Sequence, residues 1–159
     1  MPEIHETFDT LYKQYTKVFR HSNHSSHTRA GLMKSVPEKT TGVYVIWKKG
    51  ALSPIYIGSS GKIEKKLKLS GSSIRSRMFG SSTPYHFDTT ANQFKYGPTT
   101  AGVPPAGYHY SISLSEIEIT CLAVYSPSAP AVAPAVLEHL LIQGFINQYH
   151  DLPEANQKI

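Results

Sequence analysis

Two tyrosines in matched sequence settings are the side chains of this chain that most suggest chemistry. Tyr44 closes the triplet Gly42-Val43-Tyr44, and twelve residues later Tyr56 opens the triplet Tyr56-Ile57-Gly58. A phenol hydroxyl donates and accepts hydrogen bonds, and it ionises near pH 10. A nearby cation lowers that pKa, after which the phenol can accept a proton. Two phenols at one site would therefore suit proton transfer.

Both tyrosines lie in short runs with the composition of β-strands. β-Branched and aromatic residues fill positions 43–47 and 55–57, and a turn-rich stretch containing Lys-Lys-Gly and Ser-Pro joins them. This pattern predicts a β-hairpin with a longer loop. Pairing of the strands would bring the two phenols together.

Candidate charged residues lie on two predicted helices. Residues 72–79 begin with two serines that can cap a helix, and this helix would carry Arg75 and Arg77. Residues two apart lie about 200° around a helix, so the two guanidinium groups cannot enter one pocket. A proline in its first turn predicts a helix over residues 134–148, with Glu138 at the rim of an apolar stripe. A carboxylate there is unusual unless it has a partner.

This order of residues resembles the GIY-YIG nuclease family, whose members cleave phosphodiesters with tyrosine, arginine, glutamate and one divalent metal ion. The resemblance covers residues 42–156, and residues 1–40 and roughly 80–109 are additions to it. It implies that Tyr44 is the general base toward the attacking water and that Tyr56 supports it. It also implies that Arg77 binds the scissile phosphate.

The same resemblance implies a metal site and a supporting residue near the C-terminus. Glu138 would be the only protein ligand of Mg²⁺, an ion that keeps several of its waters. Mn²⁺ is expected to substitute for it. Asn156 closes the sequence Pro153-Glu154-Ala155-Asn156, which resembles the closing Pro-x-x-Asn of the family. Asn156 is therefore expected to support the site.

The sequence departs from the family pattern in two places. A lysine-rich segment, residues 62–68, lengthens the interval before Arg77, and Ser81 stands where many members carry a histidine. Nearby side chains are candidates to supply positive charge or to replace the histidine, although a lysine run more often forms a solvated face. These catalytic candidates are Lys62, Lys66 and His86.

The basic composition favours a polyanionic partner. Lys and Arg number 16 against 11 Asp and Glu, which gives a net charge of +5. Nucleic acid is the first partner that such a charge suggests, and DNA is the expected one. The insert and the lysine run offer side chains that can stack on bases or bind phosphates. The expected DNA contacts are Arg75, Lys65, Lys68, Tyr85 and Lys95.

The predicted fold is a small α+β domain with a three-stranded, mainly antiparallel sheet flanked by helices. The 159 residues suit a single domain, with residues 1–40 as a helical extension and residues 80–109 as an insert expected to contact DNA. Periodicity predicts an amphipathic helix over residues 3–20, and residues 21–29 look like a loop or helix end. The other expectations are a helix-like apolar spacing over 62–68, one or two strands over 110–125 and an extended or turn-like tail over 151–156.

The cellular context follows from two observations on composition. Cys121 is the one cysteine of the chain, which fits a reducing compartment. No apolar run approaches the roughly 18 residues of a membrane span, and the N-terminus lacks the apolar core of a signal peptide. A cytoplasmic protein without a membrane partner is expected.

A compact nuclease with its own additions is most similar to a type II site-specific restriction endonuclease. One site cuts one strand, so cleavage of a double-stranded site would need a homodimer or sequential visits. One alternative is a GIY-YIG nuclease of low specificity that acts on single-stranded or branched DNA. Others are a catalytically inert nucleic-acid-binding domain and a small protein-interaction domain.

Overall fold

The structure is a computed structural model that describes residues 6, 9–10, 13, 19–63, 69–80, 83–97, 108, 110–124 and 133–156. It is an α+β fold with a four-stranded and a three-stranded antiparallel sheet. Within the described ranges, no helix has the length and apolar character needed to cross a membrane.

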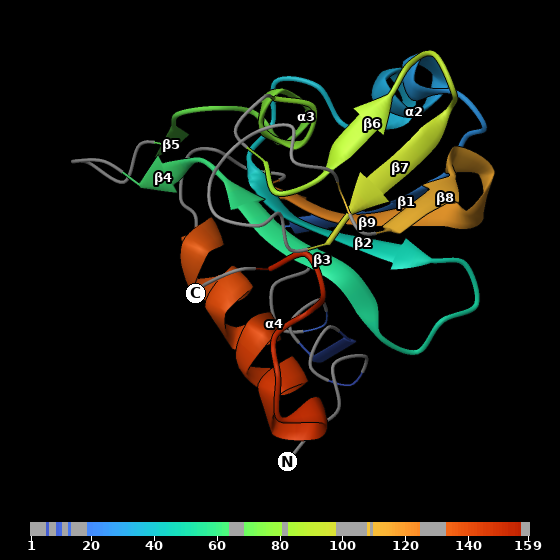
Figure 1. Cartoon of the computed structure of the whole chain (residues 1–159). Coiled ribbons are helices and arrows are strands. Elements are labelled where there is room, and N and C mark those ends of the chain that lie inside the picture. Colours follow the sequence, from blue (N-terminus) through green and yellow to red (C-terminus); the bar gives the residue numbers. More distant parts are fainter. Residues whose placement is uncertain are drawn as a thin grey trace.

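The four-stranded sheet forms the centre of the fold, with the strand order β1-β9-β2-β3 (Figure 1). Its strands are β1 (Phe19–His24), β9 (Ile117–Val124), β2 (Gly42–Lys48) and β3 (Pro54–Ser60). β2 and β3 form the hairpin that the tyrosine motifs predict, with a register shift at Ile46/Trp47. β2 is buried on both faces from residue 42 to 47, so it is apolar throughout.

One face of this sheet packs against a long C-terminal helix, α4 (Pro134–Tyr149) (Figure 1). The helix begins with a proline in its first turn, as expected, and ends at His150 in a left-handed conformation with φ 57°. Its buried side chains meet the residues of β2, β3 and β9 that point toward it. This cluster contains Val43, Val45, Trp47, Ile57, Leu122, Leu137, Leu141, Ile142 and Phe145.

The other face is covered by the second sheet and two short helices, α2 (Arg29–Ser35) and α3 (Ile74–Met78). The second sheet consists of β6 (His86–Asp88), β7 (Gln93–Tyr96) and β8 (Tyr110–Ser113), in that order. A 3₁₀ turn at Leu114–Glu116 connects β8 to β9. The aromatic side chains that fill this layer include Tyr85, Phe87, Phe94 and Tyr96.

A small hairpin extends from the end of β3. It pairs β4 (Lys62–Ile63) with β5 (Leu69–Ser70). Gly61 precedes it with φ 85°, and a Cβ at that position would lie 2.5 Å from the Cβ of Thr41. Glycine is therefore the residue that this turn accepts.

Several sequence expectations prove wrong in detail. The main sheet has four strands rather than three, because residues 19–24 form the edge strand β1 instead of continuing a helix or loop. The expected N-terminal helix is present at the described residues Glu6, Asp9, Thr10 and Lys13, but it does not extend into β1. β1 has the polar sequence Phe-Arg-His-Ser-Asn-His, and it is a strand because its backbone pairs with β9. The side chains of such a strand lack the pattern from which a strand is predicted.

The lysine-rich segment and the insert also differ from expectation. Lys62 and Ile63, which begin the lysine-rich segment 62–68, form β4 rather than part of a helix, and residues 64–68 lie outside the described residues. The insert contributes β6 and β7, which pair with β8 to form the second sheet. Residues 110–124 form two strands, in different sheets, where one or two strands were expected. Of the two serines that could cap α3, Ser73 is the N-cap.

Candidate active site around the paired tyrosines

Tyr44 and Tyr56 lie on the same face of the β2–β3 hairpin. Tyr44 is paired with Gly58, and Ile46 is paired with Tyr56, so the two tyrosines are diagonal neighbours. Their ring centroids are 5.9 Å apart. Tyr44 is fully buried, whereas Tyr56 is only partly buried. The structure therefore brings the two phenols to one place, as their spacing predicts.

The glycine of the second motif has a steric role. A Cβ at Gly58 would lie 2.8 Å from the hydroxyl oxygen of Tyr44 and 2.6 Å from the ring of Tyr56. The Tyr44 ring is enclosed in the core and cannot move aside. Any larger residue at position 58 would separate the two phenols. The close packing of the pair therefore requires glycine at this position.

A third phenol, that of Tyr85, completes the cluster. Its hydroxyl oxygen lies 3.3 Å from that of Tyr44 and 2.9 Å from the carbonyl oxygen of Met78. Its ring centroid is 4.9 Å from that of Tyr56. Tyr85 is only 2% exposed, so the expectation that it contacts DNA is wrong. Its sequence neighbourhood, a Ser/Thr/Pro-rich stretch, gives no sign of burial.

Burial raises the pKa of Tyr44, of Tyr56 and of Tyr85, and it is the largest cause at each phenol. At Tyr56 the charge of Glu138 is the next cause that raises the pKa. The charge of Arg77 lowers the pKa of all three phenols, although it does not offset burial. At Tyr56 the hydroxyl of Tyr44 also lowers the pKa, as expected for a hydrogen-bond donor.

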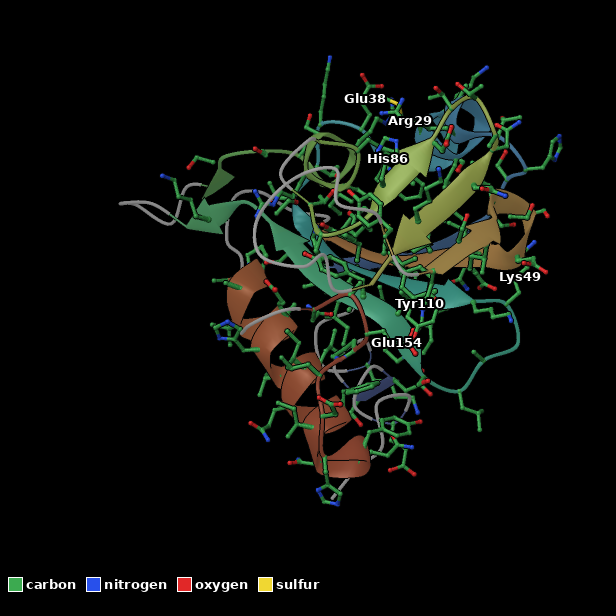
Figure 2. All side chains as sticks on the ribbon, in the orientation of Figure 1. Arg29, Glu38, Lys49, His86, Tyr110 and Glu154 are labelled. Carbon is green, nitrogen blue, oxygen red and sulfur yellow. The ribbon has the colours of Figure 1, made fainter. Side chains whose placement is uncertain are left out.

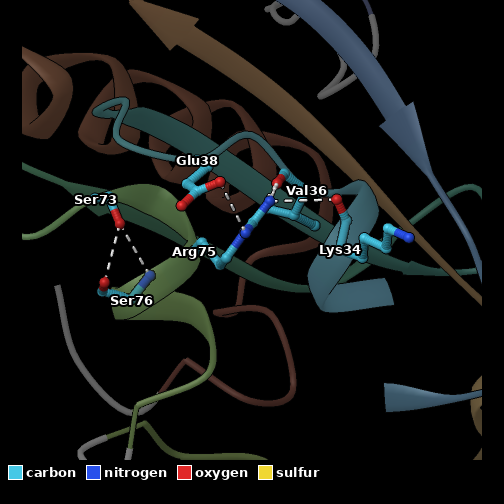
Figure 3. Close-up of polar contacts among 6 residues, drawn as sticks. All are labelled: Lys34, Val36, Glu38, Ser73, Arg75 and Ser76. Carbon is cyan, nitrogen blue, oxygen red and sulfur yellow. Dashed lines mark hydrogen bonds and ion pairs between the residues drawn. The ribbon is translucent and has the colours of Figure 1, made fainter. Parts of the chain in front are cut away.

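The two arginines of α3 point in different directions. Arg77 is exposed, and its charge reaches the tyrosine cluster. Arg75 instead connects α3 to the segment before β2, where it donates to the carbonyl oxygens of Val36 and Lys34 and pairs with Glu38 at 3.4 Å (Figure 3). A structural contact thus takes the place of the DNA contact expected at Arg75.

Glu138 lies in the first half of α4, beside the edge strand β3. The hydroxyl of Ser59 donates a hydrogen bond to its Oε2 atom. Glu138 is partly buried, and its charge reaches Tyr56. The side chains of Arg77 and Glu138 therefore act on the same phenol from two helices. Ser59 is a contact that sequence reasoning missed, although it directly follows the second motif.

A divalent cation would find a single carboxylate here. The described residues include no group of three or more His, Cys, Asp or Glu side chains that could enclose a metal. Glu138 offers carboxylate oxygen of the kind that Mg²⁺ takes, and one of its two oxygens accepts from Ser59. The donor set fits an ion that keeps most of its waters and takes further oxygens from a substrate.

Asn156 supports the hairpin through the backbone of β3. Its side chain accepts from the amide of Ile57 at 2.9 Å and donates to the carbonyl oxygen of the same residue at 2.8 Å. The neighbouring amide of Ala155 donates to Ile55. The turn-like tail thus lies against β3 beside Tyr56, and the Asn156 side chain binds the backbone of that strand.

The remaining candidates lie farther from the phenols or outside the described residues. Lys62 is exposed on β4, and Lys65, Lys66 and Lys68 lie outside the described residues. Lys95 pairs with Asp88 at 3.0 Å, so its ammonium group is not the free cation expected at a phosphate. His86 is exposed on the polar face of β6 and stacks against Tyr108.

Comparisons with known proteins give no relative for this arrangement. No family model, no curated protein and no solved structure matches the chain. Its function must therefore be argued from its own residues.

Proposed function

We propose that this protein is a metal-dependent endonuclease that hydrolyses phosphodiester bonds in DNA, as the resemblance to GIY-YIG nucleases implies. One observation carries the proposal: the Tyr56 ring lies 5.9 Å from that of Tyr44, Ser59 of the same strand binds Glu138 of α4, and the charges of Glu138 and of Arg77 on α3 both change the pKa of Tyr56. A cation for the phosphate, an oxygen ligand for a metal and a hydroxyl for proton transfer are the groups that this reaction needs.

In this proposal Arg77 binds the scissile phosphate. Its guanidinium stays charged at all relevant pH values and can donate two parallel hydrogen bonds to phosphate oxygens. It is exposed and, among the described residues, has no hydrogen bond or ion pair to compete with a ligand. A bound phosphate would take the place of water around this guanidinium.

The phenols act as a pair in which Tyr56 receives the proton of the attacking water. Tyr56 is the member that a water molecule can reach, because Tyr44 is 0% exposed. The hydroxyl of Tyr44 supports an ionised Tyr56 by hydrogen bonding, and Tyr85 supports Tyr44 in turn. This assignment exchanges the two tyrosine roles that the family resemblance implies.

Glu138 would hold Mg²⁺ or Mn²⁺ through a carboxylate oxygen, with Ser59 orienting that carboxylate. When bound, such an ion supplies positive charge to the phosphate and to the leaving oxygen. The raised pKa values of the phenols mean that the protein's own charges do not prepare a base. The positive charge of a bound metal ion is what would lower them.

The more specific proposal is that the protein is a type II site-specific restriction endonuclease that acts as a homodimer on double-stranded sites. The support is the outer face of the second sheet, which presents hydrogen-bonding side chains in cross-strand rows. A two- or three-stranded ribbon of this kind can enter the major groove and contact base edges. The row members are His86, Lys95 and Ser111, then Asp88, Gln93 and Ser113.

The test is to incubate the protein with Mg²⁺ and a plasmid of known sequence. Discrete fragments would support the site-specific enzyme, and a smear would indicate a nuclease of low specificity. Plasmid that stays intact with Mg²⁺ and with Mn²⁺, while the same protein still retards DNA at low salt, would leave only a binding domain. Intact plasmid without retardation would remove the nucleic-acid proposal altogether.

A further inference from the structure

A second polar site lies next to the tyrosine cluster, in a pocket of about 200 Å³. Arg29 of α2 and His86 of β6 line it, together with Thr83, Phe79 and Tyr85. Figure 2 shows Arg29 and His86 at the same end of the molecule. Both belong to segments added to the predicted core, one to the N-terminal extension and one to the insert.

Arg29 carries a positive charge without a counter-ion among the described residues. Its guanidinium lies 5.4 Å from the centre of the Phe79 ring and makes long contacts of 3.4 Å to the Phe79 carbonyl oxygen and to the sulfur of Met33. A guanidinium has five N–H donors, so several remain available. Among the described residues that line the pocket there is no carboxylate. Arg75, by contrast, pairs with Glu38.

The ligand that suits this pocket is a phosphate. An uncompensated guanidinium beside an imidazole attracts an anion, and Arg binds phosphate with two parallel hydrogen bonds. A volume of about 200 Å³ is below the usual range for a complete small-molecule ligand. A single anionic group attached to a larger molecule outside fits better.

The source of that phosphate follows from the position of the pocket. Tyr85 lines it, and the hydroxyl of Tyr85 lies 3.3 Å from that of Tyr44. Phe79 also lines it and is the C-cap of α3, the helix that carries Arg77. A nucleic-acid strand with its scissile phosphate at Arg77 would therefore have a neighbouring phosphate near this pocket. We propose that Arg29 and His86 bind a backbone phosphate of DNA that flanks the scissile one. This inference rests on the proposed nuclease function.

The first test measures binding of short fluorescent duplexes of unrelated sequence in chelator, over a KCl series. Arg29→Met should weaken binding about tenfold on every duplex, the loss expected for one charge-assisted contact. It should also make the slope of log K against log salt shallower by about 0.9, the value for one phosphate. Lys49→Met is the matched control, because it removes one charge from an exposed position away from the pocket (Figure 2).

The second test adds negative charge and does not depend on the packing of Arg29. His86→Glu changes the charge by one unit at an exposed position, whereas Lys49→Glu changes it by two units elsewhere. If the site is local, His86→Glu weakens binding more than Lys49→Glu does. Thermal melting of each variant shows that it is folded.

The possible failures are distinguishable. If the wild type binds and cleaves DNA but Arg29→Met and His86→Glu behave like the Lys49 variants, the phosphate site is wrong and the nuclease proposal stands. A change in which sequence is cut would mean that these residues contact bases, which also overturns the inference. Binding of inorganic phosphate that depends on Arg29, without any effect on DNA affinity, would assign the pocket to a free anion. Loss of all DNA binding by the wild type overturns both proposals.

Discussion

The side chain of Asn156 hydrogen bonds to both the amide and the carbonyl group of Ile57, a residue 99 positions earlier in the chain. These bonds close the exposed edge of β3 directly beside Tyr56. The C-terminal tail is thereby a part of the hairpin that carries the tyrosines.

Asn156→Ala should lower the free energy of unfolding by about 1–3 kcal/mol, since it leaves buried backbone groups of Ile57 without partners. Urea unfolding measures the change. Asn147→Ala is the matched control: among the described residues, the Asn147 side chain accepts one exposed hydrogen bond, from Gln143, so its loss should change stability by no more than about 0.5 kcal/mol. Equal effects of the two substitutions would show that the tail does not hold β3.

Substitution of the two arginines of α3 should have different effects, one on stability and the other on activity. Arg75→Ala removes the contacts to Val36, Lys34 and Glu38 and should lower the melting temperature. Arg77→Ala should leave melting unchanged and remove most DNA cleavage, because its guanidinium is exposed and makes no hydrogen bond or ion pair among the described residues. Melting curves and plasmid cleavage on both variants check this. The opposite pattern would place the phosphate at Arg75.

The tyrosine roles can be separated by removing single hydroxyl groups. Tyr56→Phe should lower the cleavage rate by about 10²–10⁴, as for loss of a general base. Tyr44→Phe should cost less, because Tyr44 is fully buried and acts through Tyr56. Single-turnover rates at saturating enzyme give the comparison, and binding in chelator shows that substrate affinity is retained. A larger loss for Tyr44→Phe would restore the roles that the family resemblance implies.

Glu138→Gln should abolish cleavage with Mg²⁺ and with Mn²⁺ while preserving or strengthening DNA binding in chelator. The amide keeps the size of the side chain but removes a negative charge near the phosphate. Glu154→Gln is the control, since Glu154 lies in the tail and interacts with Tyr96. Normal cleavage by Glu138→Gln at ordinary Mg²⁺ would contradict the proposed metal site.

The buried phenols should make folding stability depend on pH in the alkaline range. Tyr44, Tyr56 and Tyr85 have raised pKa values, and burial raises the pKa of Tyr96 to about 12. Unfolded phenols ionise near pH 10, so the unfolded state gains stability above that pH while these groups stay protonated in the fold. Folding stability should therefore be unaffected by them below pH 10 and fall as the pH rises toward 12. Phenolate absorbance should show late-titrating tyrosines among the 10 of the chain; titration of all of them near pH 10 would contradict the burial of the cluster.

Local pattern was enough to predict the elements that carry the candidate site. Strand-like composition around Tyr44 and Tyr56 predicted their hairpin, the serine pair at 72–73 predicted the start of α3 and a proline predicted the start of α4. These signals work because strand alternation, helix capping and proline geometry depend on neighbouring residues. The order of Tyr, Tyr, Arg, Glu and Asn along the chain could be read directly, and it suggested a family.

Tertiary structure decided what no neighbouring residue encodes. β1 is a strand because it pairs with β9, and the insert is a sheet because β7 pairs with both β6 and β8. The same long-range packing buries Tyr85 against Tyr44 and directs Arg75 to Val36 instead of solvent. Each of these outcomes depends on a partner many residues away, whose position the chain acquires only when the two sheets close over a common core.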